Sequence, residues 1–204
     1  MFGSGHDGTS TEDRFGKRGV VGNQGEDYFG KALVNSGLDK FTFFRSLGIP
    51  AKPNQVKLHG DVDCTISNGL DLILIDIKRW KRGFLWAIPF THWPMRGWMP
   101  LVMAKRKGQA PTWNKLSSNM AAALDRYSAA LPHANVSAMV IFVPTVDRDP
   151  DSGPEHVELL IWPGAIKSYT VGEAISEIML RLGAEVVEPL PEITQLLKGL
   201  QIHK

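Results

Sequence analysis

The chain has 204 residues, of which 43% are hydrophobic and 22% charged, and its formal net charge is +2. These values are typical of one globular domain, and they exclude a wholly disordered chain, a collagen-like chain and a coiled coil. An uncharged apolar run of about 18 residues is absent, so no membrane span is expected. The N-terminus lacks an apolar signal core and Cys64 is the single cysteine, which together favour a cytoplasmic protein without disulfides.

Charge is distributed unevenly along the chain. Residues 77–124 contain nine basic residues and no Asp or Glu, whereas residues 147–204 contain ten acidic and five basic residues. A basic stretch of this kind attracts phosphate groups, so DNA is a candidate partner. The alternative interpretation is a solvated face on which basic residues cluster by chance.

The patterns in chain order predict an α/β fold. Residues 1–22 are rich in Gly, Ser, Thr and charge, which predicts a flexible N-terminal arm. An apolar stripe with helical spacing predicts a helix over residues 24–36. The later patterns predict a strand over 41–45, a strand and a long loop over 80–112, a helix over 113–131, strands over 137–144 and 156–162, and helices over 171–182 and 191–200.

A hairpin is the most informative part of the sequence. Two apolar runs flank Asn68–Gly69, a dipeptide typical of tight turns, and predict strands near residues 61–67 and 70–78. With this turn, Ser67 faces Leu70. The second strand is apolar on both faces until its end, which favours a central position in the sheet.

Four charged residues lie at the open end of this hairpin. In the predicted register Asp61 faces Asp76, and Asp63 is a diagonal neighbour of Asp76 at about 7–8 Å. Lys78 projects from the same face because side chains alternate with period two. Two carboxylates at this spacing can hold one divalent cation. The alternative is a solvated strand end with an Asp–Lys ion pair. The opposite face is predicted to be core and carries Val62, Cys64, Ile66, Ile73, Ile75 and Ile77.

Glu26 adds a third carboxylate. Positions 26, 29 and 33 share one face of the predicted helix, so Glu26 lies on the buried stripe of Phe29 and Leu33. A buried carboxylate needs a partner, and a metal site on the adjoining sheet would supply one. In the alternative interpretation, Glu26 simply favours the dipole of the first helical turn.

The order of these motifs resembles the nuclease-related domain group of the PD-(D/E)xK nuclease superfamily. The resemblance rests on Gly25–Glu26, on Asp63 at the end of G-D-V-D, on Asp76–Lys78 as D-I-K, and on the following Trp80. It covers about residues 20–145. It implies a restriction-endonuclease-like core with a mixed four-stranded sheet flanked by helices.

Three features depart from the family pattern. Val62, not Pro, precedes the first motif Asp, and Asp76 replaces the Glu that is common in this group. The Trp-rich insert at residues 84–112 is longer than expected. From the extent of the resemblance we expect three parts: the arm at 1–22, the nuclease-like core at 23–145, and an acidic strand–helix extension at 146–204 that packs on the core.

The resemblance implies metal-dependent hydrolysis of phosphodiester bonds in DNA. Glu26, Asp63 and Asp76 would hold Mg²⁺ or Mn²⁺, with the carbonyl of Ile77 as an additional oxygen ligand. Lys78 would orient the attacking water or stabilise charge on the phosphate. Asp61 is a rival for the role assigned to Asp63. The candidate DNA contacts are Arg79, Lys81, Arg82, Lys105, Arg106 and Lys107.

Two other functions fit the same sequence. The first is a phage or mobile-element assembly protein, of the head-completion or head–tail junction type, that uses a nuclease-like fold structurally. Such a protein would be virion-associated and would form homo-oligomers or bind viral partners. The second is a DNA-binding module without catalysis. Trp80, Trp86, Trp93 and Trp98 could stack on bases, although tryptophans of this kind more often lie in a core or an interface.

Overall fold

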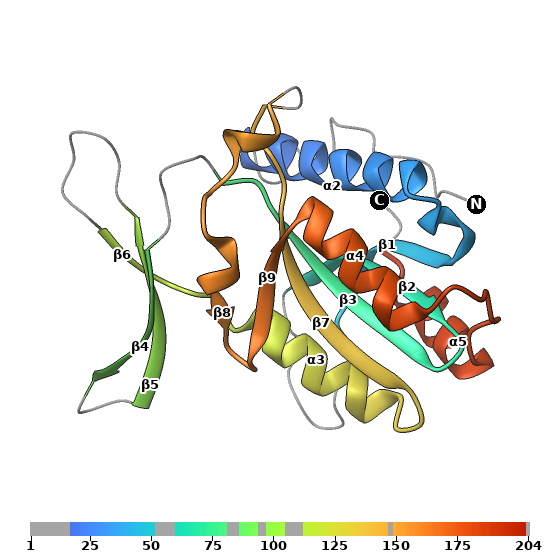
Figure 1. Ribbon diagram of the computed structural model, residues 1–204. Coiled ribbons are helices and arrows are strands. Elements are labelled where there is room, and N and C mark those ends of the chain that lie inside the picture. Colours follow the sequence, from blue (N-terminus) through green and yellow to red (C-terminus); the bar gives the residue numbers. More distant parts are fainter. Residues whose placement is uncertain are drawn as a thin grey trace.

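Two β-sheets and four α-helices make up the described part of the chain (Figure 1). The computed structural model describes the backbone of residues 17–51, 60–80, 86–93, 97–104, 112–146 and 149–202, and the side chains of residues 24–51, 60–80, 116–146, 149–158 and 160–202.

The elements follow one another in mixed order. The helices are α2 (Lys17–Asn35), α3 (Asn119–Ala130), α4 (Val171–Leu182) and α5 (Pro191–Leu200), with the short 3-10 helices η1 (Leu38–Lys40), η2 (Pro150–Ser152) and η3 (Val157–Leu159). The strands are β1 (Thr42–Gly48), β2 (Asp61–Asn68), β3 (Asp71–Lys78), β4 (Trp86–Trp93), β5 (Gly97–Ala104), β6 (Thr112–Lys115), β7 (Asn135–Phe142), β8 (Ile161–Trp162) and β9 (Ile166–Thr170).

The central sheet has six strands in the order β1-β2-β3-β7-β9-β8. The β3–β7 and β7–β9 pairs are parallel, and the other pairs are antiparallel. The α/β class and the mixed sheet are therefore as expected, but the prediction of four strands is wrong. The two further strands, β8 and β9, come from residues that the family resemblance does not cover.

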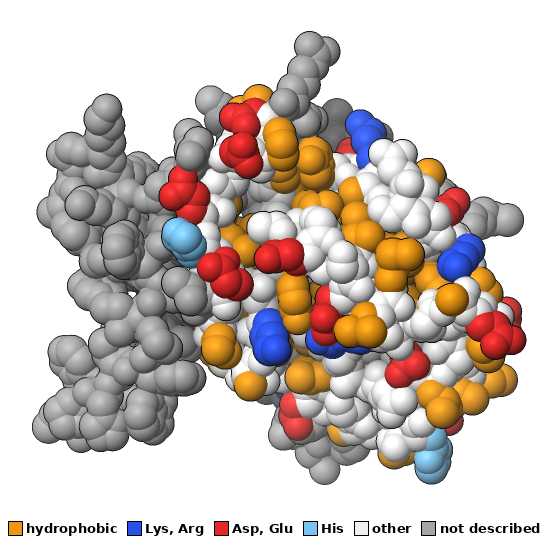
Figure 2. Space-filling view, in the orientation of Figure 1, with side chains coloured by type: hydrophobic (Ala, Val, Ile, Leu, Met, Phe, Trp, Pro, Cys, Tyr) orange, Lys and Arg blue, Asp and Glu red, His pale blue; other side chains and the backbone are white. Residues whose placement is uncertain are grey.

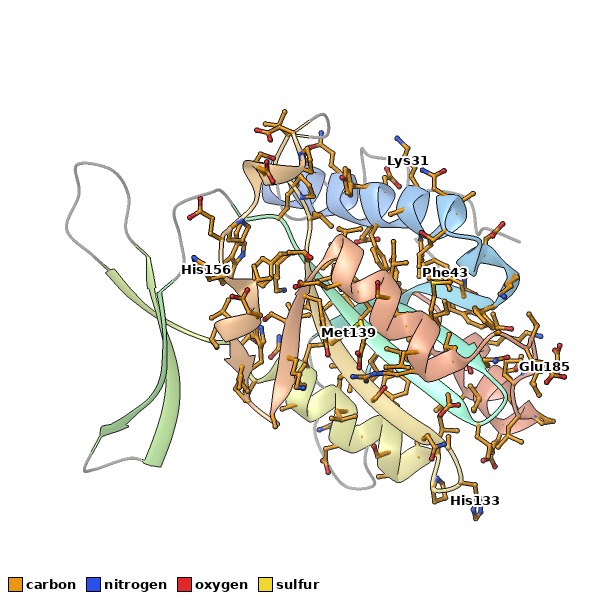
Figure 3. The ribbon with its side chains drawn as sticks, viewed as in Figure 1. Lys31, Phe43, His133, Met139, His156 and Glu185 are labelled. Carbon is orange, nitrogen blue, oxygen red and sulfur yellow. The ribbon has the colours of Figure 1, made fainter. Side chains whose placement is uncertain are left out.

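Helices cover both faces of the central sheet and bury two apolar cores. On one face, α2 contributes Phe29 and α4 contributes Ile178. On the other face, α3 contributes Tyr127 and α5 contributes Leu197. Met139, in the middle of β7, is fully buried beneath the first of these layers (Figure 3). A strand covered on both faces needs apolar residues in succession, which explains the unbroken run in β3.

The Trp-rich segment is folded as strands. The sequence predicted one strand and a long loop over residues 80–112, whereas β4, β5 and β6 form a second antiparallel sheet of three strands. This sheet lies to one side of the central sheet, next to β8 (Figure 1). Prolines at positions 89 and 100 obscured the strand pattern, and the β4–β5 register shifts between Ile88 and Thr91.

The predicted C-terminal extension contributes to the central sheet itself. Its strand β9 pairs in parallel with β7, and α4 and α5 pack on opposite faces of the sheet. The sequence did not predict β9, because this strand is short and one of its buried positions is the polar Ser168, which hides the apolar alternation. The strand predicted over residues 156–162 is instead η3 followed by the two-residue β8.

The helices were predicted with different accuracy. The structure confirms the helices over residues 171–182 and 191–200 as α4 and α5. Helix α2 begins at Lys17, inside the segment predicted as a flexible arm, and residues 1–16 of that arm lie outside the described residues. Helix α3 begins only at Asn119, because β6 occupies the start of the predicted helix.

Candidate active site at the open end of the β2–β3 hairpin

The β2–β3 hairpin has a different register from the predicted one. Asn68 pairs with Asp71, so Gly69 and Leu70 are the two turn residues. The side chain of Asn68 is buried, where it donates to the carbonyls of Leu182 and Glu185 and accepts from the Val187 amide. Asn68 is therefore a tertiary anchor, and the glycine (φ 56°) takes the first turn position.

The corrected register changes which residues meet at the open end of the hairpin. The pairs run from Asn68 and Asp71 to Cys64 and Ile75, a shift of two residues from the prediction. A continued ladder would place Asp63 opposite Asp76 and Asp61 opposite Lys78, but its last pair is Cys64 with Ile75, so these four residues lie beyond it. A two-residue shift keeps the predicted face of each β3 side chain, because the period is two.

Asp63 fills the point where β2 and β3 separate. The paired part of the ladder ends at Cys64 and Ile75. The next amide that would continue it, that of Ile77, donates to Oδ2 of Asp63 over 2.5 Å. The carboxylate thus takes the place of a main-chain acceptor, and its position is set by the backbone of β3.

The direction of side chains in β2 changes at this same point. Val62 packs in the core under α3 and α5, whereas Cys64 packs in the core under α2 and α4. The prediction that both share one face is therefore wrong for Val62. On the neighbouring strand, Ser46 lies opposite Asp63 and has a φ of 51°, a conformation that non-glycine residues adopt at a cost. The kink at Ser46 accompanies the change of face.

Lys78 holds both oxygens of Asp76. Its Nζ lies 2.8 Å from Oδ1 and 2.7 Å from Oδ2, and the side chains of Asp76 and Lys78 are 13% and 28% exposed. Burial lowers the pKa of Lys78. The carboxylates of Asp76 and Asp63, and more weakly that of Asp61, together raise the pKa by more than burial lowers it, so the net shift is upward. The lysine therefore stays charged among these acids.

Asp63 is destabilised as an anion. Burial raises its pKa well above the ordinary value, and the neighbouring charge of Asp76 raises it again. Lys78 and the Ile77 amide lower the pKa only in part, and Glu26 adds a further increase. A buried carboxylate whose ionisation is made unfavourable by a neighbouring acid marks a place where an added cation would be stabilised.

Helix α2 brings Glu26 close to these acids. The helix crosses over the end of β3 (Figure 1), and it approaches closely because a Cβ at Gly25 would lie 3.3 Å from the Ile77 side chain. The half-buried Glu26 raises the pKa of Asp63, so its carboxylate lies within electrostatic range of the site. Arg45 binds the helix from β1, through the Glu26 carbonyl and the Asp27 carboxylate.

The predicted DNA contacts are only partly within the described residues. Arg79 donates to the carbonyls of Pro144 (3.1 Å) and Thr145 (2.8 Å) and to Oε1 of Gln24. Its guanidinium therefore ties α2 to the chain after β7, a structural role that the sequence did not indicate. The side chains of the other five predicted contacts lie outside the described residues: Lys81, Arg82, Lys105, Arg106 and Lys107.

Trp80 is half-buried and packs against the core. Its ring packs 5.2 Å from that of Phe142 and 6.1 Å from that of Trp162, between centroids. These contacts explain why the sequence places an aromatic residue after the D-x-K motif, and they leave base stacking by Trp80 without support. The side chains of Trp86, Trp93 and Trp98 lie outside the described residues.

The chemistry of the donor set fits a hard divalent cation. Asp63 and Asp76 supply carboxylate oxygens, and the carbonyl of Lys78 accepts from Val143, directly after β7. Because successive peptide groups in a strand point in opposite directions, the Ile77 carbonyl points toward β2, the side on which Asp63 lies. Within the described residues, no three or more His, Cys, Asp and Glu side chains are grouped to hold a metal, so the predicted trio with Glu26 is not assembled as a ligand cluster.

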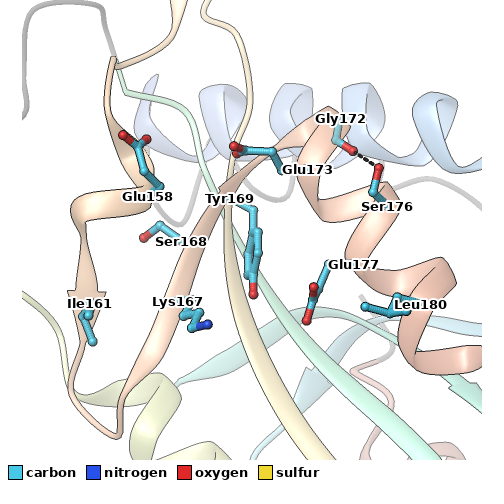
Figure 4. Close-up of a pocket in the computed structure, with 10 residues that line it drawn as sticks. All are labelled: Glu158, Ile161, Lys167, Ser168, Tyr169, Gly172, Glu173, Ser176, Glu177 and Leu180. Carbon is cyan, nitrogen blue, oxygen red and sulfur yellow. Dashed lines mark hydrogen bonds between the residues drawn. The ribbon is translucent and has the colours of Figure 1, made fainter.

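A concave region lies between β9, η3 and α4 (Figure 4). This acidic groove has a volume of about 680 Å³ and is lined by Glu158, Ile161, Lys167, Ser168, Tyr169, Gly172, Glu173, Ser176, Glu177 and Leu180. Each of its acids has a local partner, since Glu158 contacts His156, Glu173 caps α4 at Thr170, and Glu177 pairs with Arg181.

The surface around this groove mixes acidic and apolar side chains (Figure 2). Leu180 is 79% exposed and Met179 49% exposed on the outer side of α4. Each groove acid makes a local contact, whereas Asp63 at the open end of the hairpin has its pKa raised by burial and by the charge of Asp76. The catalytic candidates therefore remain those of the hairpin.

Comparisons with protein-family models, with curated proteins and with solved structures found no match for this chain. The resemblance to PD-(D/E)xK nucleases therefore stays a prediction from the motifs. Within the described ranges, no helix combines the length and the apolar composition that crossing a bilayer requires.

Proposed function

We propose that this protein is a metal-dependent nuclease that hydrolyses phosphodiester bonds in DNA. The observation that carries the proposal is the pair Asp63 and Asp76 at the separated end of β2 and β3, with Lys78 on both oxygens of Asp76. The raised pKa of Asp63 adds support, because perturbed carboxylates gather where chemistry is done. The resemblance of the motif order to PD-(D/E)xK nucleases agrees with this assignment.

Each residue has a defined role in the proposal. Asp63 and Asp76 hold Mg²⁺ or Mn²⁺ together with the Ile77 carbonyl, and Glu26 orients water at the edge of the site. The cation supplies Lewis-acid polarisation of the phosphate and a more acidic water. Lys78 presents its ammonium group to the negative charge that develops on the phosphoryl oxygens.

The choice of DNA as substrate rests on charge. The open end of the hairpin begins the 77–124 segment, which holds nine basic residues and no acid. Contacts of Lys and Arg with phosphates provide affinity without sequence preference. We therefore expect the protein to bind DNA more weakly as salt increases.

The proposal is tested by cleavage of supercoiled plasmid and single-stranded DNA in Mg²⁺, in Mn²⁺ and in EDTA. The wild type should nick DNA only with metal, and Asp76→Ala and Lys78→Ala should each reduce the rate by about 10³-fold or more. Asp71→Asn is the matched control, because it changes an aspartate of the same strand at the turn end, and it should cut like the wild type.

Two results would overturn the proposal. One is a folded wild type that cuts neither substrate with either metal, and the other is equal cutting by the Asp76→Ala and Lys78→Ala variants. In the first case, a ring or another high-order oligomer in size-exclusion chromatography would favour the assembly protein considered in the sequence analysis. DNA binding that survives EDTA without any cutting would instead favour a non-catalytic DNA-binding module.

A further inference from the structure

Lys78 and a divalent cation would compete for the same two oxygens. Its Nζ contacts Oδ1 and Oδ2 of Asp76 at 2.8 and 2.7 Å, so the ammonium faces both oxygens of this carboxylate. Of the Asp63 oxygens, Oδ2 accepts from the Ile77 amide. A cation that binds Asp76 would therefore lie next to the positive charge of Lys78, unless the lysine moves.

The surroundings of Lys78 give it a second acceptor. Asp61, at the start of β2, is exposed, and its charge contributes to the raised pKa of Lys78, so its carboxylate lies within electrostatic range of the ammonium. Lys78 itself is 28% exposed, and its four-carbon chain can turn about several bonds. Rotation of this side chain can transfer the ammonium from Asp76 toward Asp61 without a change in the backbone.

We propose that Lys78 is the resident counter-ion of Asp76, that a divalent cation displaces it toward Asp61, and that this exchange sets the metal affinity of the site. The inference rests on the proposed metal-dependent function and adds how the cation gains access to the carboxylates. It also assigns a role to Asp61, which holds the displaced lysine and does not ligate the metal.

The size of the effect follows from the fraction of molecules in which Asp76 is available. If Lys78 occupies Asp76 in about nine molecules of ten, the apparent Kd for the cation is about tenfold weaker than that of the free carboxylate. Removal of the ammonium should therefore tighten metal binding. Removal of Asp61 should weaken it, because the displaced lysine loses its acceptor.

The test measures Mn²⁺ binding by titration calorimetry, with free Mn²⁺ followed by electron paramagnetic resonance, in the absence of DNA. Lys78→Met should bind Mn²⁺ about tenfold more tightly than the wild type while losing cleavage. Asp61→Asn should bind Mn²⁺ about threefold more weakly. Asp71→Asn, at the turn end, should remain within about twofold of the wild type.

A double variant separates the lysine exchange from simple long-range attraction by Asp61. In Asp61→Asn/Lys78→Met, the loss caused by Asp61→Asn should disappear, because its effect passes through the lysine. If Asp61→Asn weakens binding equally with and without Lys78, the exchange is refuted. If Lys78→Met does not fold, as judged by circular dichroism, an unchanged Kd in Asp61→Asn alone refutes it.

The outcomes distinguish this inference from the proposed function. Equal or weaker Mn²⁺ binding by a folded Lys78→Met variant overturns the exchange but leaves a metal-dependent nuclease intact. Failure of both the wild type and Lys78→Met to bind Mn²⁺ or Mg²⁺ overturns the metal-dependent function, and the exchange with it.

Discussion

The two ends of the β2–β3 hairpin carry polar residues in opposite ways. At the turn end, the Asn68 side chain makes three hydrogen bonds to the chain around α4, the Ser67 hydroxyl donates to the Asp71 carbonyl, and the Asp71 carboxylate accepts from Asn135. At the open end, the charge of Asp76 raises the pKa of Asp63, Lys78 pairs with Asp76, and Asp63 accepts from the Ile77 amide.

The polar groups at the turn end stabilise the fold, whereas those at the open end reduce the stability of the folded state. Buried polar groups that are fully hydrogen-bonded specify the fold at little cost. The carboxylate of Asp63 instead has its pKa raised by burial and by Asp76, which means that ionising it in the folded protein is unfavourable. A charge arrangement that lowers stability is typical of a functional site, because activity often requires groups that are unfavourable for folding.

The largest expected effect is on the rate of DNA nicking, and it distinguishes the two acids of β2 at the open end. Asp63→Asn should reduce metal-dependent nicking by about 10³-fold, because one of the two cation-holding carboxylates loses its charge. Asp61→Asn should reduce nicking by less than about tenfold, since Asp61 is exposed and does not bridge β2 and β3. The rates of plasmid nicking in Mg²⁺ decide between the two.

Both variants should be folded, because Asn keeps the shape of Asp and the amide oxygen introduced by Asp63→Asn can still accept from the Ile77 amide. A larger loss in Asp61→Asn than in Asp63→Asn would reverse the assignment and make Asp61 the metal ligand.

The next effect concerns stability at the turn end. Asn68→Ala removes three hydrogen bonds and leaves the Leu182 and Glu185 carbonyls and the Val187 amide without that partner. The free energy of unfolding should fall by about 3 kcal/mol. Asn135→Ala is the matched control because its side chain is exposed, and it should cost less than about 1 kcal/mol. Urea denaturation measures both, and equal losses would contradict the tertiary role of Asn68.

The smallest effect is a gain of stability at the open end. In EDTA at pH 7, Asp63→Asn should raise the free energy of unfolding by about 1 kcal/mol, because it removes a buried charge that ionises unfavourably. For a chain of this size, that gain corresponds to an increase in Tm of about 2–4 °C. An unchanged or lower Tm in a folded variant would contradict the strain assigned to Asp63.

The gain should depend on pH in a defined direction. Because folding raises the pKa of Asp63 above its ordinary value of 3.8, the folded protein binds this proton more tightly than the unfolded chain. The contribution of this proton to the free energy of unfolding is complete below pH 3.8, and it is lost as the pH rises through the pKa of Asp63 in the folded protein. The advantage of Asp63→Asn should therefore shrink as the pH is lowered toward 4, as measured by thermal unfolding.

The sequence predicted the hairpin but not its register. Asn68–Gly69 was a correct signal for a turn, yet the side chain of Asn68 is used by residues more than a hundred positions later, which no local pattern reveals. The error left the faces of the β3 side chains unchanged, because a shift by two preserves them. It missed that the ladder ends at Cys64 and Ile75 and that Val62 packs on the opposite face from Cys64.

The amino-acid sequence by itself determined the α/β class, the two C-terminal helices and the residues that gather at the open end. Those features depend on local periodicity and on alternation within a strand, which the sequence encodes directly. Only the tertiary structure decided the positive φ of Ser46, the hydrogen bonds of Arg79 to the chain after β7, and the addition of β9 to the sheet. Each of these depends on contacts between segments far apart in the chain, and their cost or gain exists only once the segments have met.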